Sequence, residues 1–432
     1  MPDLKDKISG RTARVGILGM GYVGLPLALE FARKGFRVTG FEVDAGRVKE
    51  LSRGRSYITD VASRDIAEVV RAKKLSATTR FDDLRKCDAI LICVPTPLRK
   101  TREPDNSFVY EACVHVAKRL RKDQLVVLES TTYPGTTEEM ARPLLEESGM
   151  KAGKDFHLAF SPERVDPSNK TYGIKNTPKI VGGCSRKCTD LAAGLYGEIV
   201  DQVVPVSGSS AAEMVKLLEN TFRAVNIGLV NEMALMCDKL GLDIWEIVGA
   251  AATKPFGFMP FYPGPGLGGH CIPVDPEFLA WKMKSMNFEP RFIDLAGAVN
   301  SQMPEYAAGR VSRILNESKK SVKGSRILVL GAAYKPGVND VRESPSVDVM
   351  TLLLKLGAEV SYHDPFVPYL EVSGKRLRSR PLSAKMLASA DLTAILTAHK
   401  EVDYTLVVSK SRLVFDARNA TSGTKRKNIY KL

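Results

Sequence analysis

The sequence predicts an α/β protein in which two doubly wound domains are joined by a long central helix. Three observations support this fold class. Short apolar, β-rich runs alternate with helical patterns up to residue 205, which is typical of a parallel sheet covered by helices. The same alternation returns after residue 319, and the segment between them keeps apolar residues at helical spacing. We therefore expect domains at 11–205, 206–318 and 319–432.

The first domain opens with a strand that ends in a glycine-rich turn. Residues 13–18 are apolar and β-rich, and residues 24–34 show the pattern of a following helix. Further buried strands are expected at 37–43, 88–94 and 125–129, with 156–160 and 179–182 extending the sheet. Strands separated by helices indicate a parallel sheet with both faces covered.

The central helix is predicted from residue 209 to residue 242. Ser210 and Glu213 form a capping-box pattern at its start. Its apolar repeat comprises Met214, Leu218, Val225, Leu229, Met233 and Met236. At ~1.5 Å per residue this helix would be roughly 45 Å long, too long for a surface helix of one lobe. We expect it to link two lobes and to take part in a subunit contact, with Gly228 a point where it can bend.

The last part of the chain repeats the opening theme. Residues 326–331 resemble 14–19, 358–364 resemble 37–44, and 390–396 resemble the strand near residue 88. Residues 412–418 are a further strand candidate. This pattern indicates a second doubly wound lobe without a glycine fingerprint of its own. Two such lobes on either side of a helix predict a cleft where two ligands meet.

Composition and charge narrow the class of protein. The chain has 432 residues, of which 44% are hydrophobic and 26% charged, as is ordinary for a soluble globular protein. Its net charge of +14 indicates either a solvated basic surface or an anionic partner, and no pattern resembles a nucleic-acid module. No apolar run approaches the ~20 residues that span a bilayer.

The number and spacing of the cysteines indicate a cellular compartment and do not indicate a metal site. Seven of them are widely spread, and this odd number indicates a reducing cytoplasm. Cys184 and Cys188 lack the matching second pair that a zinc site needs, so no metal is expected.

The turn after the first strand carries a dinucleotide fingerprint, Gly19-Met20-Gly21-Tyr22-Val23-Gly24. The first glycine permits the tight turn, the second lets the backbone approach a pyrophosphate, and the third lets helix pack on strand. Glu42 follows the next strand, where a carboxylate can accept from both ribose hydroxyls and repel a 2′-phosphate. The sequence therefore predicts a Rossmann-like domain that binds NAD rather than NADP. Arg47 either holds the adenosine side or is an exposed helix residue.

A cysteine in a glycine-flanked loop suggests what the dinucleotide is for. Cys271 follows Gly266, Gly268 and Gly269, which would leave the backbone open to a ligand. A thiolate can trap an aldehyde, hold it for a second hydride transfer and leave from a thioester. Fingerprint and cysteine together predict oxidation of an alcohol to a carboxylate. Asp275 either orients a base or water near the thiol or caps the next helix.

Three further residues carry side chains suited to this chemistry. Lys216 and Asn220 share one face of the central helix, about opposite its apolar repeat. They form either a solvated polar stripe or, if the helix floors the cleft, a pair of donors to an oxyanion. Glu163 lies on a turn after a strand, where it could activate water for thioester hydrolysis or be part of an ordinary polar loop.

These pieces, in this order, resemble the UDP-glucose/GDP-mannose dehydrogenase family of four-electron nucleotide-sugar oxidoreductases. The resemblance runs from about residue 13 to about residue 420, on the motifs GILGMGYVGLPLA, CVPTP, ESTTYPGTT, FSPERVDP, EMVKLLENTFRAVNIGLVNE, PGPGLGGHCIPVDP and GAAYKPGVNDVRESPS. It implies two Rossmann-like domains joined by a central helical region, and NAD as cofactor.

The resemblance also implies roles for individual residues. Cys271 matches the thiohemiacetal and thioester nucleophile, Lys216 and Asp275 assist proton transfer, and Asn220 is an oxyanion donor. Glu163 and Thr132 match residues that position the hydrolytic water. Thr96 and Arg342 are implied cofactor contacts. The implied substrate contacts are Glu163, Arg164, Lys216, Asn220, Phe261, Tyr262, Gly268, Tyr334, Lys335 and Arg418.

The residues around the cysteine favour one branch of this family. His270 precedes it and Ile272, Pro273 and Val274 follow, where glucose-type members usually place Phe, Gln or Pro, and Lys. This is similar to UDP-N-acetylglucosamine 6-dehydrogenases of surface-polysaccharide biosynthesis. The alternatives are UDP-N-acetylmannosamine or UDP-glucose as substrate and, more distantly, a two-electron hydroxy-acid dehydrogenase or a NAD-sensing binding protein. We expect a cytoplasmic homo-oligomer, a dimer or larger, that binds a UDP-sugar and neither nucleic acid nor membrane.

Overall fold

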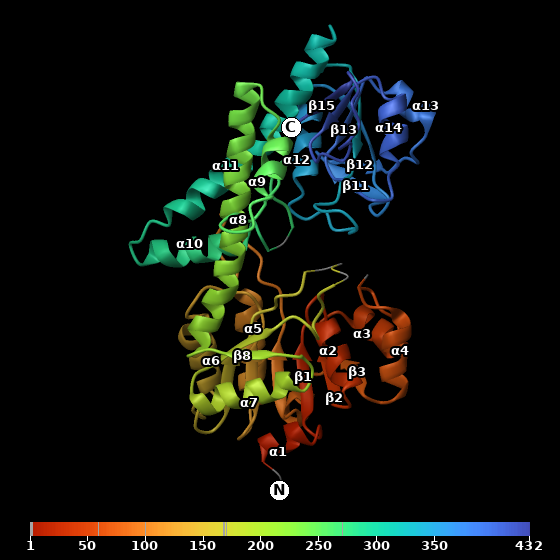
Figure 1. Cartoon of the computed structure of the whole chain (residues 1–432). Coiled ribbons are helices and arrows are strands. Elements are labelled where there is room, and N and C mark those ends of the chain that lie inside the picture. Colours follow the sequence, from red (N-terminus) through yellow and green to blue (C-terminus); the bar gives the residue numbers. More distant parts are fainter. Residues whose placement is uncertain (1–2, 59, 100, 167–168, 170, 270) are drawn as a thin grey trace. The chain divides into compact units, whose positions relative to one another are not determined.

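The computed structural model describes residues 3–58, 60–99, 101–166, 169, 171–269 and 271–432. It divides into two compact units (Figure 1): unit 1 comprises residues 1–219 and 277–287, and unit 2 comprises residues 220–276 and 288–432. Helix α8 (Ser209–Leu240) begins in unit 1 and continues into unit 2. The predicted fold class, two doubly wound α/β domains joined by a long central helix, is confirmed.

Unit 1 is built on an eight-stranded sheet with the order β3-β2-β1-β4-β5-β6-β7-β8. These strands are β1 (Arg14–Leu18), β2 (Arg37–Phe41), β3 (Leu75–Thr78), β4 (Ala89–Ile92), β5 (Leu125–Leu128), β6 (His157–Phe160), β7 (Lys179–Gly183) and β8 (Val203–Pro205). Neighbouring strands run parallel except β6 and β7, which are antiparallel. The carboxyl ends of the parallel strands β1, β4, β5 and β6 therefore meet at one edge of the sheet, where open α/β sheets bind ligands.

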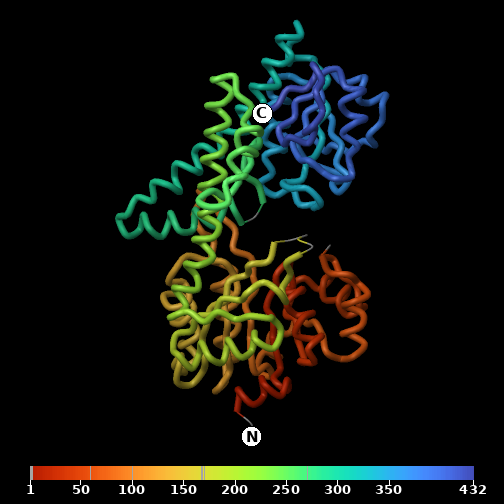
Figure 2. The backbone as a smooth tube through the Cα atoms, viewed as in Figure 1, coloured from red at the N-terminus to blue at the C-terminus, as the bar shows by residue number. Residues whose placement is uncertain are grey.

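Helices cover both faces of this sheet because successive strand residues point to opposite sides. Val15 and Ile17 join a core with α1 (Leu4–Ser9), α2 (Gly24–Arg33), α4 (Ser63–Arg71) and α7 (Arg186–Gly197). Ile90 and Ile92 join the opposite core with α5 (Ser107–Ala117) and α6 (Arg142–Glu146). The remaining elements are α3 (Ala45–Ser52), a 3₁₀ helix (Phe81–Lys86) and a π-helical turn (Thr137–Ala141). Figure 2 shows the red N-terminal segment beside α7, where Arg11 Nε lies 2.8 Å from Glu198 Oε2.

Unit 2 contains a five-stranded parallel sheet with the order β10-β9-β13-β14-β15. The strands are β9 (Arg326–Leu330), β10 (Glu359–His363), β13 (Leu392–Ile395), β14 (Val414–Asp416) and β15 (Ile429–Lys431). Its helices are α12 (Pro345–Lys355), α13 (Ala384–Ser389) and α14 (Tyr404–Lys410). An antiparallel hairpin, β11 (Tyr369–Val372) and β12 (Lys375–Arg378), was not expected from the sequence.

The helical part of unit 2 packs α9 (Ile244–Ala251) and α11 (Arg291–Glu317) against α8. Gly228 allows a close approach, because a Cβ there would lie 3.2 Å from Cα and Cβ of Ala296. Asn231 Nδ2 donates to Asn300 Oδ1 at 2.9 Å, and Asn300 Nδ2 donates to the Ala224 carbonyl at 3.1 Å. Gly228 therefore serves the packing of two helices. Helix α10 (Asp275–Ser285) packs mainly in unit 1, where Trp281 contacts Tyr133 at 5.0 Å between ring centroids.

Two expectations for α8 are wrong. The helix begins at Ser209, so Ser210 lies inside it, and the Glu213 carboxylate instead accepts from the amides of Gly135 (2.6 Å) and Thr137 (2.9 Å). Glu213 thus ties the helix to the turn after β5, and burial raises its pKa to about 7.

The second wrong expectation is the alternative in which Lys216 and Asn220 form a solvated polar stripe. Lys216 and Asn220 are only 8% and 5% exposed, whereas Leu218 and Leu229 on the apolar face are 60% and 57% exposed. The face of α8 that carries Lys216 and Asn220 is therefore buried, together with Leu217 and Ala224.

Candidate active site

The glycine turn of unit 1 is shaped for a ligand. Gly19 has φ +88°, and a Cβ there would lie 2.6 Å from the Cys93 carbonyl oxygen. A Cβ at Gly24 would overlap the Gly19 carbonyl, so this glycine brings α2 onto the strand. A Cβ at Gly21 would meet nothing within 4 Å. At the start of α2, the N-cap Val23 gives no side-chain hydrogen bond to the helix amides. These amides and the space at Gly21 suit an anionic pyrophosphate.

Glu42 lies beside this turn, directly after β2, and is 6% exposed. Its carboxylate accepts long hydrogen bonds from the amides of Met20 (3.3 Å) and Asp44 (3.2 Å). Arg47 Nη1 lies 3.6 Å from Glu42 Oε2, and its guanidinium lies over the Tyr57 ring at 5.3 Å. Each carboxylate oxygen has two lone pairs, so Glu42 retains capacity for ribose hydroxyls.

The other predicted cofactor residues differ in exposure. Met20 is buried, and its carbonyl accepts from Tyr57 Oη at 2.7 Å. Tyr22 is 48% exposed, Val23 is half-buried, and Thr96 is buried after β4. The space at Gly21 and the acceptor capacity of Glu42 fit NAD, whose binding residues here would be the glycine turn and Glu42.

The turn after β5 contains Thr132, which is 1% exposed. Its hydroxyl has no hydrogen-bond partner among the residues that the structure describes. Buried polar atoms are nearly always paired, so an orphaned hydroxyl at the ligand-binding edge of a sheet indicates a place for water or a ligand. The neighbouring Ser130 Oγ is used internally and donates to the Val94 carbonyl at 2.7 Å.

The turn after β6 carries Glu163 and Arg164. Glu163 Oε1 accepts from the Val165 amide at 2.6 Å, and Glu163 Oε2 lies 3.8 Å from Lys179 Nζ. Arg164 ties the turn to α8 through Glu219 (Nη2 to Oε1, 2.5 Å) and donates to the Pro178 carbonyl at 2.6 Å. These contacts engage much of the Arg164 guanidinium within unit 1. Pro167, the last residue of the FSPERVDP motif, lies outside the described residues.

Sequence reasoning missed the polar cluster beneath this turn, which comprises Glu129, Lys179 and Tyr196. Lys179 is the first residue of β7 and Glu129 the first after β5, and the two form a buried ion pair. A lysine at the start of a buried strand was the available signal.

In unit 2, the glycines before Cys271 are packed against protein, which corrects the expectation of an open loop. A Cβ at Gly266 would lie 3.0 Å from Pro345, and one at Gly268 would lie 2.8 Å from the Glu343 carbonyl oxygen. A Cβ at Gly269 would lie 2.7 Å from the Tyr334 ring. The loop is also tied by the Gly264 amide, which donates to Asn231 Oδ1 at 3.0 Å, and by the Gly269 amide, which donates to the Arg342 carbonyl at 3.1 Å. The glycines therefore fix the loop's path.

Cys271 is exposed, whereas the other six cysteines are buried or half-buried. Its carbonyl accepts from the amides of Val274 (3.1 Å) and Asp275 (2.8 Å), which form the turn into α10. Asp275 is 3% exposed and accepts from Asn220 Nδ2 at 2.5 Å. The structure thus brings together Asn220, Asp275 and the cysteine turn. His270 lies outside the described residues.

Lys216 lies one helical turn before Asn220 on α8. Among the described residues its ammonium forms no hydrogen bond or ion pair, although it is only 8% exposed. An ammonium has three N–H donors, so a lysine at this position is suited to bind an anionic or polar ligand.

Of the residues predicted in unit 2, the substrate contacts Tyr334 and Arg418 and the cofactor contact Arg342 touch the glycine loop before Cys271. Arg418 packs on Gly264, donates from Nε to the Leu396 carbonyl at 2.9 Å, and burial lowers its pKa to about 10. Lys335 Nζ lies 5.8 Å from the Tyr334 ring centroid. Arg342 forms a two-pronged ion pair with Asp340 (2.7 and 3.0 Å).

The aromatic residues before the loop lie against other rings. Phe261 packs edge-on against Phe222, with ring centroids 5.8 Å apart. Tyr262 stacks on Trp245 at 6.2 Å and is 56% exposed.

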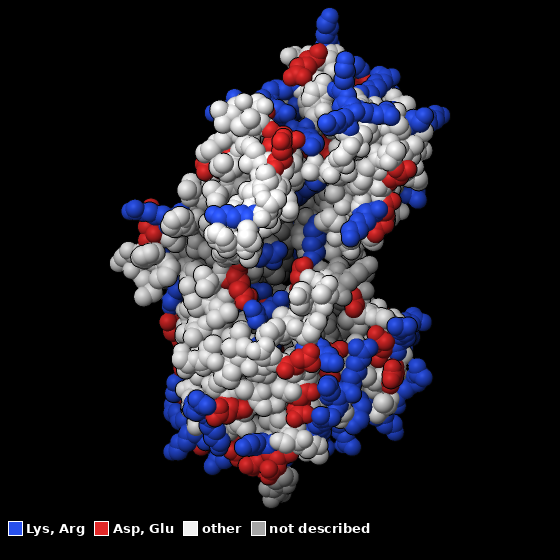
Figure 3. Space-filling view, viewed as in Figure 1, with Lys and Arg blue, Asp and Glu red and all other residues white. Residues whose placement is uncertain are grey.

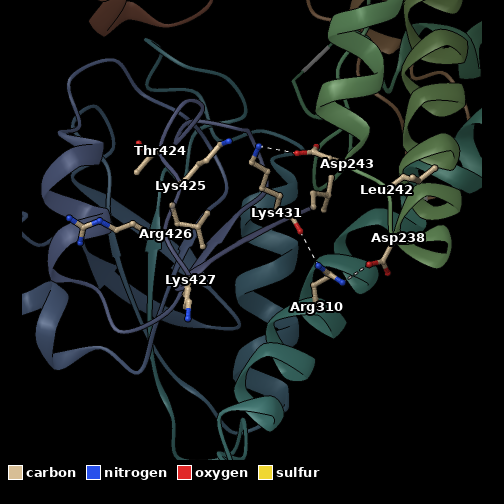
Figure 4. Close-up of a pocket in the computed structure, with 12 residues that line it drawn as sticks. Asp238, Leu242, Asp243, Arg310, Thr424, Lys425, Arg426, Lys427 and Lys431 are labelled. Carbon is tan, nitrogen blue, oxygen red and sulfur yellow. Dashed lines mark hydrogen bonds and ion pairs between the residues drawn. The ribbon is translucent and has the colours of Figure 1, made fainter.

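A groove of about 760 Å³ lies elsewhere in unit 2, lined by the segment after α8 and by the C-terminal residues (Figure 4). The described residues that line it include none of the predicted site residues. Figure 4 shows Lys425, Arg426 and Lys427 pointing in different directions, so these cations do not converge on one ligand. On the face shown in Figure 3, Lys and Arg are interspersed with Asp and Glu.

Two searches of the described residues bear on metals and membranes. Neither Cys184 nor Cys188 belongs to a group of three or more His, Cys, Asp or Glu side chains that could hold a metal ion; their sulfurs lie 3.5 Å apart. No described helix is long and apolar enough to cross a bilayer.

Comparisons with known proteins assign a family to this arrangement. Models of the UDP-glucose/GDP-mannose dehydrogenase family match as an NAD binding domain over residues 13–200, a central domain over 210–302 and a UDP binding domain over 328–423. The chain is 36% identical to the UDP-N-acetyl-D-glucosamine 6-dehydrogenase of Pseudomonas aeruginosa, with 82% of this chain and 83% of that protein aligned.

It is also 36% identical to the UDP-N-acetyl-D-mannosamine dehydrogenase of Pyrococcus horikoshii, over 94% of this chain and 95% of that protein. A solved structure of the UDP-D-ManNAc dehydrogenase from Pyrococcus horikoshii superimposes with a TM-score of 0.88 at 33% identity, covering 97% of this chain and 98% of the other. The chain therefore belongs to the UDP-glucose/GDP-mannose dehydrogenase family of NAD-dependent enzymes.

Proposed function

We propose that the chain oxidises the 6-hydroxymethyl carbon of UDP-N-acetylglucosamine to a carboxylate, through a covalent intermediate on Cys271. The observation that carries the proposal is the exposed Cys271, whose turn leads into Asp275, the hydrogen-bond partner of Asn220. A two-electron dehydrogenase needs no nucleophile, whereas a four-electron one uses a thiolate to hold the aldehyde.

NAD⁺, when bound, would supply the hydride acceptor, and two NAD⁺ in turn would each take one hydride: the first removal leaves the aldehyde, and the second converts its thiohemiacetal on Cys271 to the thioester. In the proposed first half, the Cys271 thiolate bonds to the carbonyl carbon of the aldehyde. Lys216 and Asn220 donate hydrogen bonds to the oxygen that becomes negative, and Asp275 takes part in the proton transfers. Deleting one oxyanion donor costs about 3–4 kcal/mol of transition-state stabilisation in other enzymes, so the donors matter.

In the second half the thioester is hydrolysed. Glu163 accepts a proton from water while the water oxygen bonds to the thioester carbon, and Cys271 leaves as a thiolate. Thr132 orients the water, a role that its unpaired buried hydroxyl supports.

The remaining contacts with cofactor and substrate are proposed from the resemblance to the UDP-glucose/GDP-mannose dehydrogenase family. Glu42, Arg47, Thr96, Arg342 and residues 19–24 hold the cofactor; Arg164, Phe261, Tyr262, Gly268, Tyr334, Lys335 and Arg418 hold the UDP-sugar. We keep 11–205, 206–318 and 319–432 as the proposed domain boundaries. A cytoplasmic location and a role in surface-polysaccharide synthesis complete the proposal.

The apolar face of α8 supports a homodimer. Within unit 2 its exposed residues are Phe222, Leu229, Met233, Met236 and Leu240. Their exposed fractions range from 39% to 70%, and contiguous apolar surface of this kind marks an interaction site. A second copy of the chain would bury the same face on both partners.

UDP-N-acetylmannosamine is the second candidate substrate, favoured by the coverage and TM-score of the mannosamine relative. NADH formation measured with UDP-N-acetylglucosamine, UDP-N-acetylmannosamine, UDP-glucose and GDP-mannose separates the candidates. The proposal expects UDP-N-acetylglucosamine to have the highest kcat/KM and to yield two NADH per sugar. Cys271→Ser should lose steady turnover, and normal turnover by this variant would refute the covalent scheme.

A further inference from the structure

A buried ion pair lies beneath the turn that carries Glu163. Glu129 is 1% exposed and Lys179 is 6% exposed, and Lys179 Nζ lies 2.6 Å from Glu129 Oε2. Two charges taken out of water cost free energy, and an apolar pair of similar volume is often no less stable. Stability alone is therefore a poor reason for this pair.

The donors of Lys179 indicate what the pair does. An ammonium has three N–H groups. Two hydrogen bonds use these groups, one to the Glu129 carboxylate at 2.6 Å and one to the Pro162 carbonyl at 3.1 Å, and Glu163 Oε2 lies at an ion-pair distance of 3.8 Å. Pro162 and Glu163 are consecutive residues of the same turn. Lys179 is thus bound on one side to the buried core and faces the turn on the other.

Glu129 fixes Lys179 in turn. The Tyr196 hydroxyl on α7 donates to Glu129 Oε1, and Lys179 Nζ lies 5.2 Å from the Tyr196 ring centroid. Burial alone would lower the pKa of Lys179, but the carboxylates of Glu129 and Glu163 raise it above the ordinary value. Burial raises the pKa of Glu129, and the Lys179 ammonium opposes that effect. Lys179 therefore remains a cation whose place is set by groups below the turn.

We infer that Lys179, held by Glu129 and Tyr196, is a positioning residue that fixes the carboxylate of Glu163 for hydrolysis of the thioester. The Val165 amide donates to Glu163 Oε1 at 2.6 Å, and the Lys179 ammonium forms an ion pair with Glu163 Oε2 at 3.8 Å. Each oxygen keeps a lone pair free to accept the proton of water. The inference rests on the proposed function, because it assigns Lys179 a part in the second half of that reaction.

The test compares Lys179→Met with the matched control Lys175→Met, which makes the same change at an exposed residue four positions earlier. Each variant is mixed rapidly with NAD⁺ and UDP-N-acetylglucosamine, and NADH and the mass of the intact chain are followed. For Lys179→Met we expect a burst of two NADH per chain, an acyl adduct on Cys271, and a steady rate about 10- to 100-fold below wild type. The dissociation constant of NAD⁺ should stay within about twofold. Lys175→Met should match wild type in every readout.

A double variant separates positioning from stability. Lys179→Met leaves Glu129 as an unpaired buried charge, and Glu129→Gln combined with Lys179→Met removes that charge. The double variant should regain the thermal stability that Lys179→Met loses, yet still accumulate the acyl adduct. Recovery of wild-type hydrolysis together with stability would show that the pair is only structural and would overturn the inference. If Lys179→Met lowers the NADH burst by the same factor as the steady rate, the variant impairs the steps before hydrolysis, and the inference is overturned as well.

The wild-type chain distinguishes this failure from failure of the proposed function. If wild type forms only one NADH per sugar, and Glu163→Gln leaves no adduct on Cys271, the proposed function itself is wrong. If wild type forms two NADH and Lys179→Met hydrolyses the thioester at the wild-type rate, only the present inference fails.

Discussion

The two doubly wound sheets place a carboxylate at equivalent positions but use it differently. In unit 1 the Gly19 amide donates to the Phe41 carbonyl at 2.9 Å, and Glu42 is the next residue; in unit 2 the Gly331 amide donates to the His363 carbonyl at 2.9 Å, and Asp364 is the next residue. Glu42 accepts two long backbone hydrogen bonds. Asp364 accepts from four amides, those of Ala332, Ala333, Phe366 and Val367, at 2.7 to 3.0 Å, and lies 3.0 Å from His399 Nε2.

The turns next to these carboxylates also differ: the turn in unit 1 is open, and the one in unit 2 is bonded internally. In unit 1 the space at Gly21 is open and α2 follows at once. In unit 2 the residues after Gly331 are Ala332, Ala333 and Tyr334, and α12 begins only at Pro345. His399 extends the internal network, because its Nδ1 accepts from the Gly337 amide at 3.2 Å. The turn in unit 1 therefore leaves its carboxylate and amides with hydrogen-bonding capacity, which we propose the dinucleotide uses, whereas the turn in unit 2 uses its carboxylate and amides to hold a loop.

The largest expected effect is on folding. Asp364→Ala removes a buried carboxylate and leaves several amides without an acceptor, so we expect it to lower the free energy of unfolding by about 3–5 kcal/mol. Glu42→Ala removes two long hydrogen bonds and a 3.6 Å ion pair with the half-exposed Arg47, and should cost about 1 kcal/mol. Equilibrium urea unfolding of both variants measures the difference. Equal losses in the free energy of unfolding would mean that Asp364 and Glu42 stabilise their units to the same extent.

For ligand binding, in contrast to stability, we expect substitution of Glu42 to have a large effect. Glu42→Gln should weaken NAD⁺ binding about 10- to 100-fold and reduce the preference over NADP⁺, because a charged acceptor for the ribose hydroxyls is lost. Lys335→Met should weaken UDP binding and leave NAD⁺ binding unchanged. Calorimetric titration of both ligands into both variants checks this. A loss of UDP affinity in Glu42→Gln would contradict the division of roles.

The glycines of the first turn offer a finer comparison. Gly24→Ala places a methyl group against the Gly19 carbonyl and should reduce stability by about 1–3 kcal/mol. Gly21→Ala meets no protein atom, so its stability should stay within about 0.5 kcal/mol of wild type while NAD⁺ affinity falls. Thermal unfolding with and without NAD⁺ separates the two. Wild-type affinity in Gly21→Ala would show that the pyrophosphate lies elsewhere.

The smallest effect concerns pH. Although burial raises it, hydrogen bonds from His399, Ala333 and Ala332 hold the pKa of Asp364 below its ordinary value. The stability that this carboxylate contributes is therefore complete above the unfolded pKa of about 3.9 and is lost as pH falls through the folded pKa. The stability difference between wild type and Asp364→Asn should be constant from about pH 7 to pH 5 and shrink below about pH 4. A difference that grows on acidification would contradict this assignment.

The sequence was sufficient for the fold because periodicity is a local signal. The predicted strand at 37–43 is observed as Arg37–Phe41, and the predicted helix at 24–34 as Gly24–Arg33. The hairpin of β11 and β12 was missed because the alternation in β11 covers only four residues and β12 has three basic residues among its four. The strand predicted at 179–182 is observed as β7, but its antiparallel pairing with β6 was not predicted, because strand direction depends on how the chain returns to the sheet.

The site was harder to predict where it depends on tertiary packing. Spacing placed Gly21 and Glu42 together because one βαβ unit carries both. Spacing did not show that the face of Lys216 and Asn220 is buried, since a helix pattern gives two faces without saying which one is covered. Nor did it show the contact between Lys179 and Glu129, which are 50 residues apart on strands that are not neighbours in the sheet.

The division of roles between the two sheets is tested most directly by counting bound NAD⁺. Equilibrium titration of NAD⁺ into the wild-type chain and into Gly21→Ala, with UDP titrated in parallel, gives the number of sites and shows which unit holds them. The account predicts one NAD⁺ per chain, weakened by Gly21→Ala, with UDP binding unchanged. Two NAD⁺ per chain, or one that Gly21→Ala does not weaken, would contradict it.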